Sequence, residues 1–269
     1  ETFRALGVKE GTAQATYNRG RSYFFQNRYR EALESASQAL QLSQDIQDPF
    51  RVAMSQILVG WVYVRLGEFE KAAPLLQEGV RTARDRKFGE LLPDAFEAQG
   101  ELHWEKGEME LAREALRQGA ALATEPSLSE SAVEARSQLG LLEAERGNLA
   151  RGLAECEAAL AQARRLQHRH TVARAVVNLA SVHLLRKDHA RALEVLNEIT
   201  SVTDRDLGLE FRSRALYLRG RALEGLGRAA EAQASFRQAQ QEVQQLRRAV
   251  GSAALESFAT RRDIRALHP

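Results

Sequence analysis

A glycine returns every 40 residues along this chain, at Gly20, Gly60, Gly100, Gly140 and Gly220, with Ala180 in the remaining place. A turn-forming residue such as Gly67 follows seven places later, and a small residue such as Ala72 follows five places after that. Three coupled columns at one spacing indicate an array of repeated units, each packed mainly against its neighbours. Six units of 40 residues account for residues 13–252 of the 269.

Residues 53–84 show what one unit is. Apolar residues at helical spacing run through 57–66, Gly67 supplies a turn, and a second apolar stripe runs through 69–80. This pattern predicts a helical hairpin. Gly60 lies in the middle of the first helix, where glycine costs about 1 kcal/mol relative to alanine. We therefore expect a close approach of the second helix at that point, with the alanine column opposite.

The coupled columns resemble the tetratricopeptide repeat (TPR), as in NLA at 178–180 followed by LLRKDHARALEVL at 184–196. The usual TPR unit has about 34 residues. The 40-residue unit is similar to repeats of bacterial maltose-type transcription activators, of regulatory regions attached to kinases and STAND-type ATPases, and of animal polarity scaffolds. The resemblance implies an all-α fold, an α-solenoid of six TPR-like helical hairpins in a right-handed superhelix. HEAT-type hairpins, with periods of about 40–47 residues, are the alternative α-solenoid.

The repeats divide the chain into three segments. Residues 1–12 are expected to be an N-terminal flank, the end of a preceding element in a longer chain, and 13–252 are the six repeats. Residues 253–269 are expected to form a C-terminal capping helix, because the end of a repeat array needs a cap. In that segment we expect Leu255 and Phe258 to be packed, and Arg261, Arg262 and Asp263 to be solvated.

The composition of the chain excludes several classes of binding partner. The 38 Lys and Arg nearly balance 36 Asp and Glu, giving a net charge of +2, so no nucleic acid partner is expected. No apolar run approaches about 18 residues, so no membrane partner is expected. No signal-peptide pattern opens the chain, and a cytoplasmic location is expected. The single cysteine, Cys156, lies in an apolar column of the second helices and is expected to be a buried, inert thiol.

Motifs for chemistry are missing from the sequence. It has no P-loop, GxSxG or HExxH pattern, so no enzyme activity, cofactor or metal is expected. His168 and His170 are expected to lie in a solvated connection between hairpins, without an acidic or cysteine partner at ligand spacing. Glu143 and Glu145 are expected on a solvated helix surface. Two further histidines are expected to pack between helices, His103 and His183.

The resemblance implies that the first helix of each hairpin lines a concave groove that binds a partner. Carried over by position, the expected partner-binding residues are Tyr17, Asn18, Arg21, Phe24, Trp61, Glu97, Glu101, Trp104, Arg174, Asn178, Arg214, Tyr217 and Arg221. They are zoned along the chain, apolar and aromatic first, acidic in the middle and basic last. An asparagine at such a position offers a donor and an acceptor to a peptide backbone.

Several of these side chains have a structural alternative. Trp61 and Trp104 pack within the hairpins or face the groove, and the sequence leaves both open. Arg174 is an alternative partner for Glu134 on the preceding unit. A solvated face is favoured over a binding site for the acidic residues, which are Asp94, Glu97, Glu101, Glu105, Glu134 and Glu145.

The sequence therefore predicts a non-catalytic interaction, scaffold or regulatory module that binds a protein or peptide partner in its groove. Other domains of the same parent chain are candidate partners. The alternative is a ligand- or peptide-sensing regulatory domain of a larger ATPase, kinase or transcription regulator.

Overall fold

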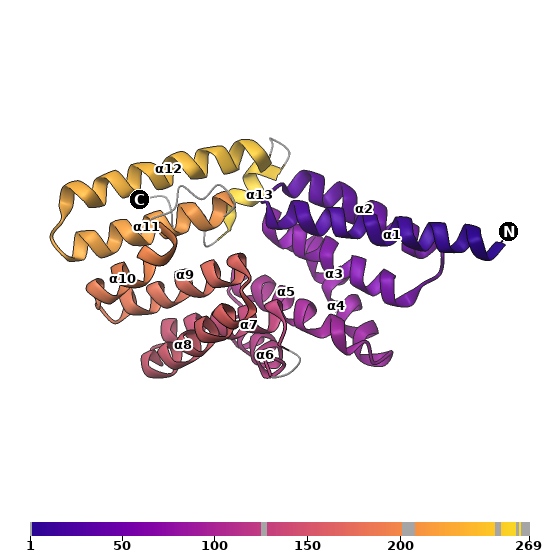
Figure 1. Cartoon of the computed structure of the whole chain (residues 1–269), viewed down its shortest axis with the longest axis horizontal. Helices are drawn as coiled ribbons and strands as arrows, with labels where there is room; N and C mark the ends of the chain where they lie inside the picture. The colour runs from indigo at the N-terminus through magenta and orange to yellow at the C-terminus, as the bar shows by residue number, and fades with distance from the viewer. Residues whose placement is uncertain (1, 125–127, 201–207, 251–253, 262–263, 265–269) are drawn as a thin grey trace. The chain divides into compact units, whose positions relative to one another are not determined.

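The chain folds into α-helices throughout the part that a computed structural model describes, which is residues 2–124, 128–200, 208–250, 254–261 and 264 (Figure 1). The helices are α1 (Thr2–Phe25), α2 (Tyr29–Asp45), α3 (Pro49–Leu66), α4 (Phe69–Asp85), α5 (Leu92–Glu105), α6 (Met109–Ala121), α7 (Glu130–Glu145), α8 (Leu149–Leu166), α9 (Arg169–Leu185), α10 (His189–Thr200), α11 (Leu209–Gly225), α12 (Ala229–Val250) and α13 (Leu255–Thr260). A short 3₁₀ turn, Gly89–Leu91, precedes α5. The expected all-α array of hairpins is confirmed.

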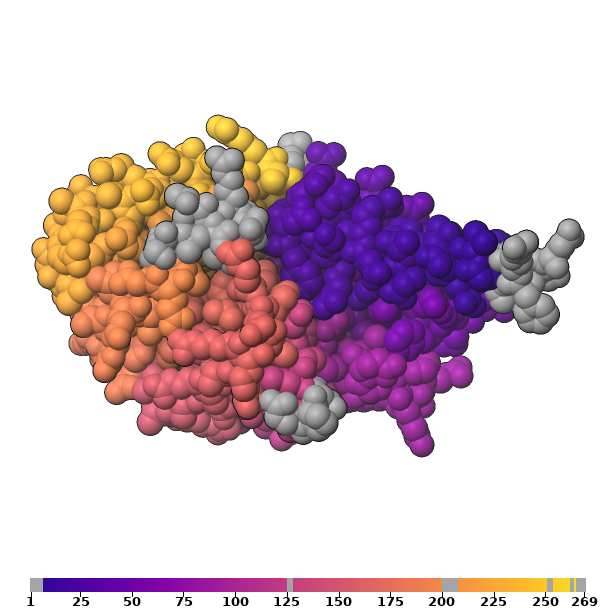
Figure 2. All heavy atoms as spheres, in the orientation of Figure 1, coloured from indigo at the N-terminus to yellow at the C-terminus, as the bar shows by residue number. Residues whose placement is uncertain are grey.

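Each hairpin pairs an odd-numbered first helix with the even-numbered second helix that follows it. The first helices also pack on one another, α3 against α1 and α5, and α9 against α7 and α11. Burial reflects this difference: α7 buries every residue from Ser131 to Ala144 except Arg136, whereas α4 buries a single stripe. First helices such as α7 are therefore more buried than second helices such as α12, which has many exposed residues and lies at the surface in the view of Figure 2.

The backbone conformation explains why turn-forming residues recur after the first helices. Within the hairpins, these residues adopt left-handed backbone, with φ of 59° at Asn27, 76° at Gly67 and 61° at Lys187. At Gly67 this conformation lets the Gly67 and Glu68 amides donate to the Val64 and Tyr63 carbonyls at the end of α3. Residues with left-handed backbone also follow the second helices, at Gln47, Lys87 and Gln167. The sequence did not predict these three positions.

The glycine column marks the close approach of the two helices of a hairpin. A Cβ added at Gly20 would lie 3.0 Å from the backbone nitrogen of Ala36, and one added at Gly140 would lie 2.9 Å from the carbonyl oxygen of Gly152. These are contacts between backbones, so a side chain has no room between them. The expectation that small residues let the helices meet is confirmed.

Contacts divide the chain into two compact units. The N-terminal unit comprises residues 1–112 and 248–261, and the C-terminal unit comprises 113–247 and 262–269. Helix α1 runs from Thr2 to Phe25 without a break at residue 12. Among the described residues, no helix has the length and apolar character needed to cross a membrane.

The C-terminal segment differs in part from expectation. Phe258 is fully buried, as expected, but Leu255 is 36% exposed and Arg261 only 1% exposed, so both expectations were wrong. Leu255 is the first residue of α13, whereas the Arg261 guanidinium is satisfied inside the protein by a main-chain carbonyl. Arg262 and Asp263 lie outside the described residues.

Candidate functional site

The expected partner-binding residues all lie on first helices, but at different depths. Seven are buried: Tyr17, Phe24, Trp61, Glu97, Glu101, Arg174 and Asn178. Four are partly buried: Arg21, Trp104, Arg214 and Tyr217. Two are exposed: Asn18 on α1 and Arg221 on α11. Trp61 therefore packs inside the protein, and Trp104 is only partly covered.

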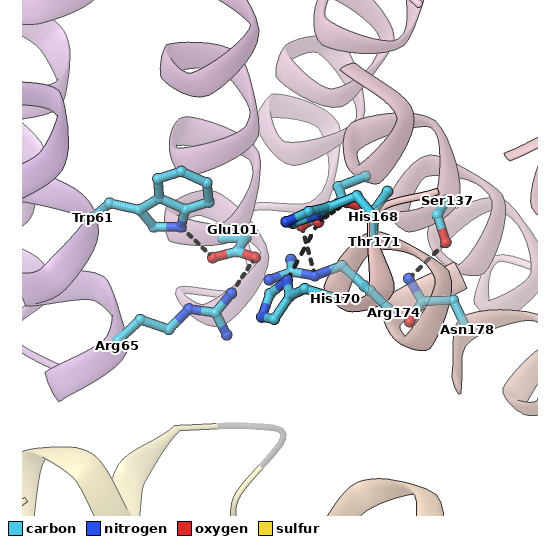
Figure 3. Close-up of polar contacts among 10 residues, drawn as sticks. Trp61, Arg65, Glu101, Ser137, His168, His170, Thr171, Arg174 and Asn178 are labelled. Atoms are coloured by element: carbon cyan, nitrogen blue, oxygen red, sulfur yellow. Dashed lines mark hydrogen bonds and ion pairs between the residues drawn. The ribbon is translucent and has the colours of Figure 1, made fainter. Parts of the chain in front are cut away.

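Trp61, Arg65 and Glu101 form an indole–carboxylate cluster in the N-terminal unit (Figure 3). The Trp61 Nε1–H and the Arg65 guanidinium, both from α3, each donate to one oxygen of the Glu101 carboxylate on α5, at 2.7 Å. Both charged side chains are only 10% exposed. This pairing satisfies a buried carboxylate with two donors and fastens α3 to α5.

Aromatic contacts join this cluster to α1. The Phe24 ring lies 4.9 Å from the Trp61 ring, centroid to centroid, and the Arg65 guanidinium carbon lies 5.8 Å from the Phe24 centroid. Nearby, burial raises the pKa of Tyr17 well above its usual range, and the Asp94 carboxylate adds to the rise. Tyr17 is therefore a neutral hydroxyl at physiological pH.

Glu134 on α7 is the centre of a second cluster, in the C-terminal unit. Its carboxylate pairs with the Nε of Arg174 on α9 at 2.9 Å and accepts a hydrogen bond from the Thr171 hydroxyl at 2.8 Å. His170 Nδ1 lies 3.5 Å from the same carboxylate (Figure 3). The structural alternative for Arg174, pairing with Glu134, is confirmed. We call Glu134, His170, Thr171 and Arg174 the α7–α9 ion cluster.

The expectation of a solvated connection between hairpins is correct for the position of His168 but wrong for His170, which lies within α9. His168 immediately precedes α9, with its Nδ1 2.9 Å from the Thr171 hydroxyl and its Nε2 3.6 Å from the carboxylate of Glu130. The His170 ring packs edge-on against Phe211, with centroids 4.4 Å apart. Their acidic partners lie about one repeat earlier in sequence, on the neighbouring first helix, so short motif spacing could not find them. Among the described residues, no group of His, Cys, Asp or Glu is arranged to hold a metal ion.

His170, Thr171 and Phe211 were not among the expected site residues. Phe211 on α11 also lies under Arg174, whose guanidinium carbon is 5.3 Å from the ring centroid. The available sequence signal is the 40-residue period itself, because Trp61 and Glu101, and likewise Glu134 and Arg174, are 40 residues apart.

The acidic residues do not form a solvated face. Glu97, Glu101 and Glu134 are buried, Asp94 and Glu105 are partly buried, and Glu145 is exposed. Asn178 is also buried, and its amide donates to the Ser137 hydroxyl at 3.0 Å. Glu101, Glu134 and Asn178 therefore bond adjacent first helices together within their own units.

Glu143 corrects another expectation of solvation. Its carboxylate is fully buried and accepts hydrogen bonds from Arg113 at 2.6 Å and Asn148 at 2.7 Å. Burial alone would raise the pKa of Glu143, but these hydrogen bonds outweigh burial and the pKa is lowered. Glu145 is exposed, as expected.

His183, His103 and the single cysteine are covered to different degrees. Burial lowers the pKa of His183, whereas the partly buried His103 lies 2.6 Å from the Glu108 carboxylate. Cys156 is buried, and burial raises its pKa well above the usual range, so the expected buried thiol is confirmed. Its Sγ donates weakly to the Ser137 carbonyl at 3.4 Å.

Comparison with known proteins identifies the family of the fold. The family described as the MalT-like TPR region matches residues 13–244. Among solved structures, BtubC (BKLC) from P. vanneervenii is similar at 19% identity and a TM-score of 0.61, covering 80% of this chain and 90% of that one. The Rap conjugation gene regulator of the plasmid pLS20, solved with the Phr* peptide, is similar at 16% identity and a TM-score of 0.69, covering 90% and 66% respectively. No curated protein sequence matches this chain.

Proposed function

The chain belongs to the MalT-like TPR family, and on this premise we propose that it is a non-catalytic interaction module whose first helices bind a segment of a protein partner. The fold is one that accepts peptides, since the similar Rap regulator was solved in complex with one. At 16% identity that likeness concerns the fold alone and assigns no contact residue in this chain.

The observation that carries the proposal is the surface of α11. Arg221 is exposed there beside the partly buried Tyr217, whose hydroxyl lies 3.4 Å from the Arg221 guanidinium. An exposed arginine beside an aromatic ring is suited to a carboxylate next to an apolar side chain, because its planar donors pair with carboxylates. We therefore assign the partner an acidic segment with apolar or aromatic residues.

Within the C-terminal unit, the α7–α9 ion cluster supports this surface without touching the partner. In the α7–α9 ion cluster, Arg174 is held by Glu134 and lies over Phe211 at the start of α11. Such contacts fix the rotamers beneath a binding surface, which preserves its geometry. Of the thirteen expected residues, we assign Arg174 and Asn178 this positioning role, whereas Trp61 and Glu101 join α3 to α5 within the N-terminal unit.

The N-terminal unit offers a second contact surface on α1. Asn18 is exposed, and the partly buried Arg21 has its guanidinium carbon 5.3 Å from the Phe25 centroid. The Asn18 amide supplies both a donor and an acceptor for a peptide backbone. Of the remaining expected residues, the partly buried Trp104 and Arg214 stay proposals as partner contacts, whereas Tyr17, Phe24 and Glu97 are buried and are assigned no contact.

The test is to select peptides from a phage-displayed random library on the immobilised chain and to measure their affinities for charge-reversal variants. We expect the selected peptides to be acidic and to lose about tenfold in affinity for Arg221→Glu. The matched control is Arg191→Glu on the second helix α10, which is similarly exposed. Equal affinity for the two variants, or the absence of any enriched peptide, would overturn the proposal.

Peptide sensing within a larger ATPase, kinase or transcription regulator is the second candidate. It is favoured by the shared fold with the Rap regulator, whose structure contains a peptide. A selected peptide that changes hydrogen exchange far from its binding site supports sensing, and a change confined to that site supports simple scaffolding.

A further inference from the structure

The end of α3 is covered by a segment from the far end of the chain. Helix α13 packs against α3, and both belong to the N-terminal unit. The Ser257 hydroxyl donates to the Glu68 carboxylate at 3.3 Å, across 189 residues of sequence. The Arg261 guanidinium donates to the main-chain carbonyl of Arg65 at 2.8 Å. We call residues 255–261 the C-terminal clasp.

Two side chains anchor the clasp. Phe258 is fully buried, Arg261 is 1% exposed, and the Arg261 guanidinium carbon lies 5.4 Å from the Phe258 centroid. A buried guanidinium needs acceptors or a ring face to offset lost hydration, and Arg261 has both. The anchors are three residues apart, with Phe258 inside α13 and Arg261 directly after the last residue of that helix. The surface at the end of α3 therefore holds the clasp by the sequence pattern Phe-x-x-Arg.

The receiving surface depends on a glycine. Gly67, with φ of 76°, approaches the clasp so closely that a Cβ there would overlap the Ser257 carbonyl. Gly107, Gly147 and Gly227 hold the same left-handed turn position in other hairpins, yet a Cβ at any of them would meet nothing within 4 Å. Gly67 therefore lies against the clasp, whereas the other three turn glycines have open space beside them.

We propose that the turn at the end of α3 is a docking site for a short helix of the pattern Phe-x-x-Arg, occupied here by the chain's own clasp. A partner segment with the same pattern competes for this site. The clasp is tethered to the chain, so its effective concentration is high and it excludes weak competitors. Arg65, whose carbonyl receives Arg261, also belongs to the indole–carboxylate cluster, so exchange of the occupant occurs beside that cluster.

The inference does not depend on the function proposed above, because the probe is the chain's own segment. A fluorescein-labelled, end-blocked peptide of residues 254–261 is titrated with the full chain and with the full-length Phe258→Ala/Arg261→Ala variant. We expect fluorescence anisotropy to give at least about tenfold tighter binding to the variant, because its own clasp no longer competes. Equal binding to both proteins, or binding to neither, would overturn the proposal.

A matched pair of glycine variants covers the case in which that double variant fails to fold. Gly67→Ala and Gly107→Ala carry the same cost of a left-handed alanine, but only the first obstructs the clasp. We expect hydrogen exchange of residues 254–261 to accelerate in Gly67→Ala and to stay at the wild-type rate in Gly107→Ala. Equal exchange of that segment in both variants would contradict docking at this turn.

Discussion

Glu101 concentrates two interactions between repeats in one side chain. It accepts hydrogen bonds from Trp61 and Arg65 while only 10% exposed, so Glu101→Ala removes two hydrogen bonds from a buried site. We expect a loss of about 3 kcal/mol in the free energy of unfolding. Urea denaturation measures the loss, and a change in tryptophan emission reports the altered surroundings of Trp61.

Two variants test the cause of that loss. Glu101→Gln keeps an acceptor without the charge and should cost less than Glu101→Ala. Glu114→Ala removes a surface carboxylate that pairs with Arg117 three residues later, and we expect little change because both partners are well exposed. A Glu114→Ala loss as large as that of Glu101→Ala would show that burial is not the decisive factor.

Glu143 gives the stability of the chain a predictable pH dependence. Its pKa in the folded protein lies below the ordinary 4.5, because the hydrogen bonds from Arg113 and Asn148 outweigh burial. The unfolded chain therefore binds the proton more tightly. The resulting stability is complete above about pH 4.5 and is lost as the pH falls through the folded-state pKa.

Replacing Glu143 tests this linkage. Glu143→Gln should lower the free energy of unfolding at neutral pH by about 1–2 kcal/mol and should weaken the further loss on acidification. Urea midpoints measured across the acid range check both effects. Glu145→Gln is the control, because Glu145 is exposed on the same helix. A Glu143→Gln chain with the wild-type acid dependence would contradict the assignment.

At the scale of single elements, the glycine column should respond to alanine according to what lies opposite. At Gly140 a Cβ would meet the backbone of Cys156 and Gly152 at 2.9 Å, so α7 and α8 must separate, and we expect a loss of about 1–3 kcal/mol. At Gly60 the nearest atoms belong to the Leu76 side chain and the nearest backbone is 3.4 Å away. Gly60→Ala should therefore cost less.

Gly11 provides a control, because Gly11→Ala is expected to stabilise the protein rather than destabilise it. It lies within α1, and a Cβ there would meet nothing within 4 Å. Gly11→Ala should raise the free energy of unfolding by about 0.5–1 kcal/mol through helix propensity alone. If Gly140→Ala were as benign as Gly11→Ala in urea denaturation, close backbone packing would not be the reason for the column.

These elements mark how far the sequence could predict the structure. The period located the hairpins because left-handed turns and close helix pairs each constrain residue type at fixed positions, as at Gly67 and Gly140. Which side chains pair across neighbouring helices follows no such rule. His170 and Glu134 are 36 residues apart, on adjacent first helices, and only packing brings them together. Arg261 is harder still, because its acceptor lies 196 residues away.

At the scale of the whole molecule, the two compact units should respond separately to damage. In a repeat array, stability is approximately a sum of unit terms and nearest-neighbour terms, so a local loss spreads mainly to neighbours. Glu101→Ala should therefore accelerate hydrogen exchange in α3 and α5 more than in α7 and α9. The C-terminal clasp should lose protection together with α3, because it packs on that helix despite following α12 in sequence.

Hydrogen exchange with mass spectrometry distinguishes this pattern from the alternatives. If proximity in sequence governed the response, residues 254–261 would follow α11 and α12 and keep their protection in Glu101→Ala. If the chain unfolded as one cooperative body, protection would fall equally in both units. The converse variant, Glu134→Ala, breaks the α7–α9 ion cluster and should accelerate exchange in α7 and α9 while the clasp keeps its protection. Contact, not order along the chain, then decides which segments open together.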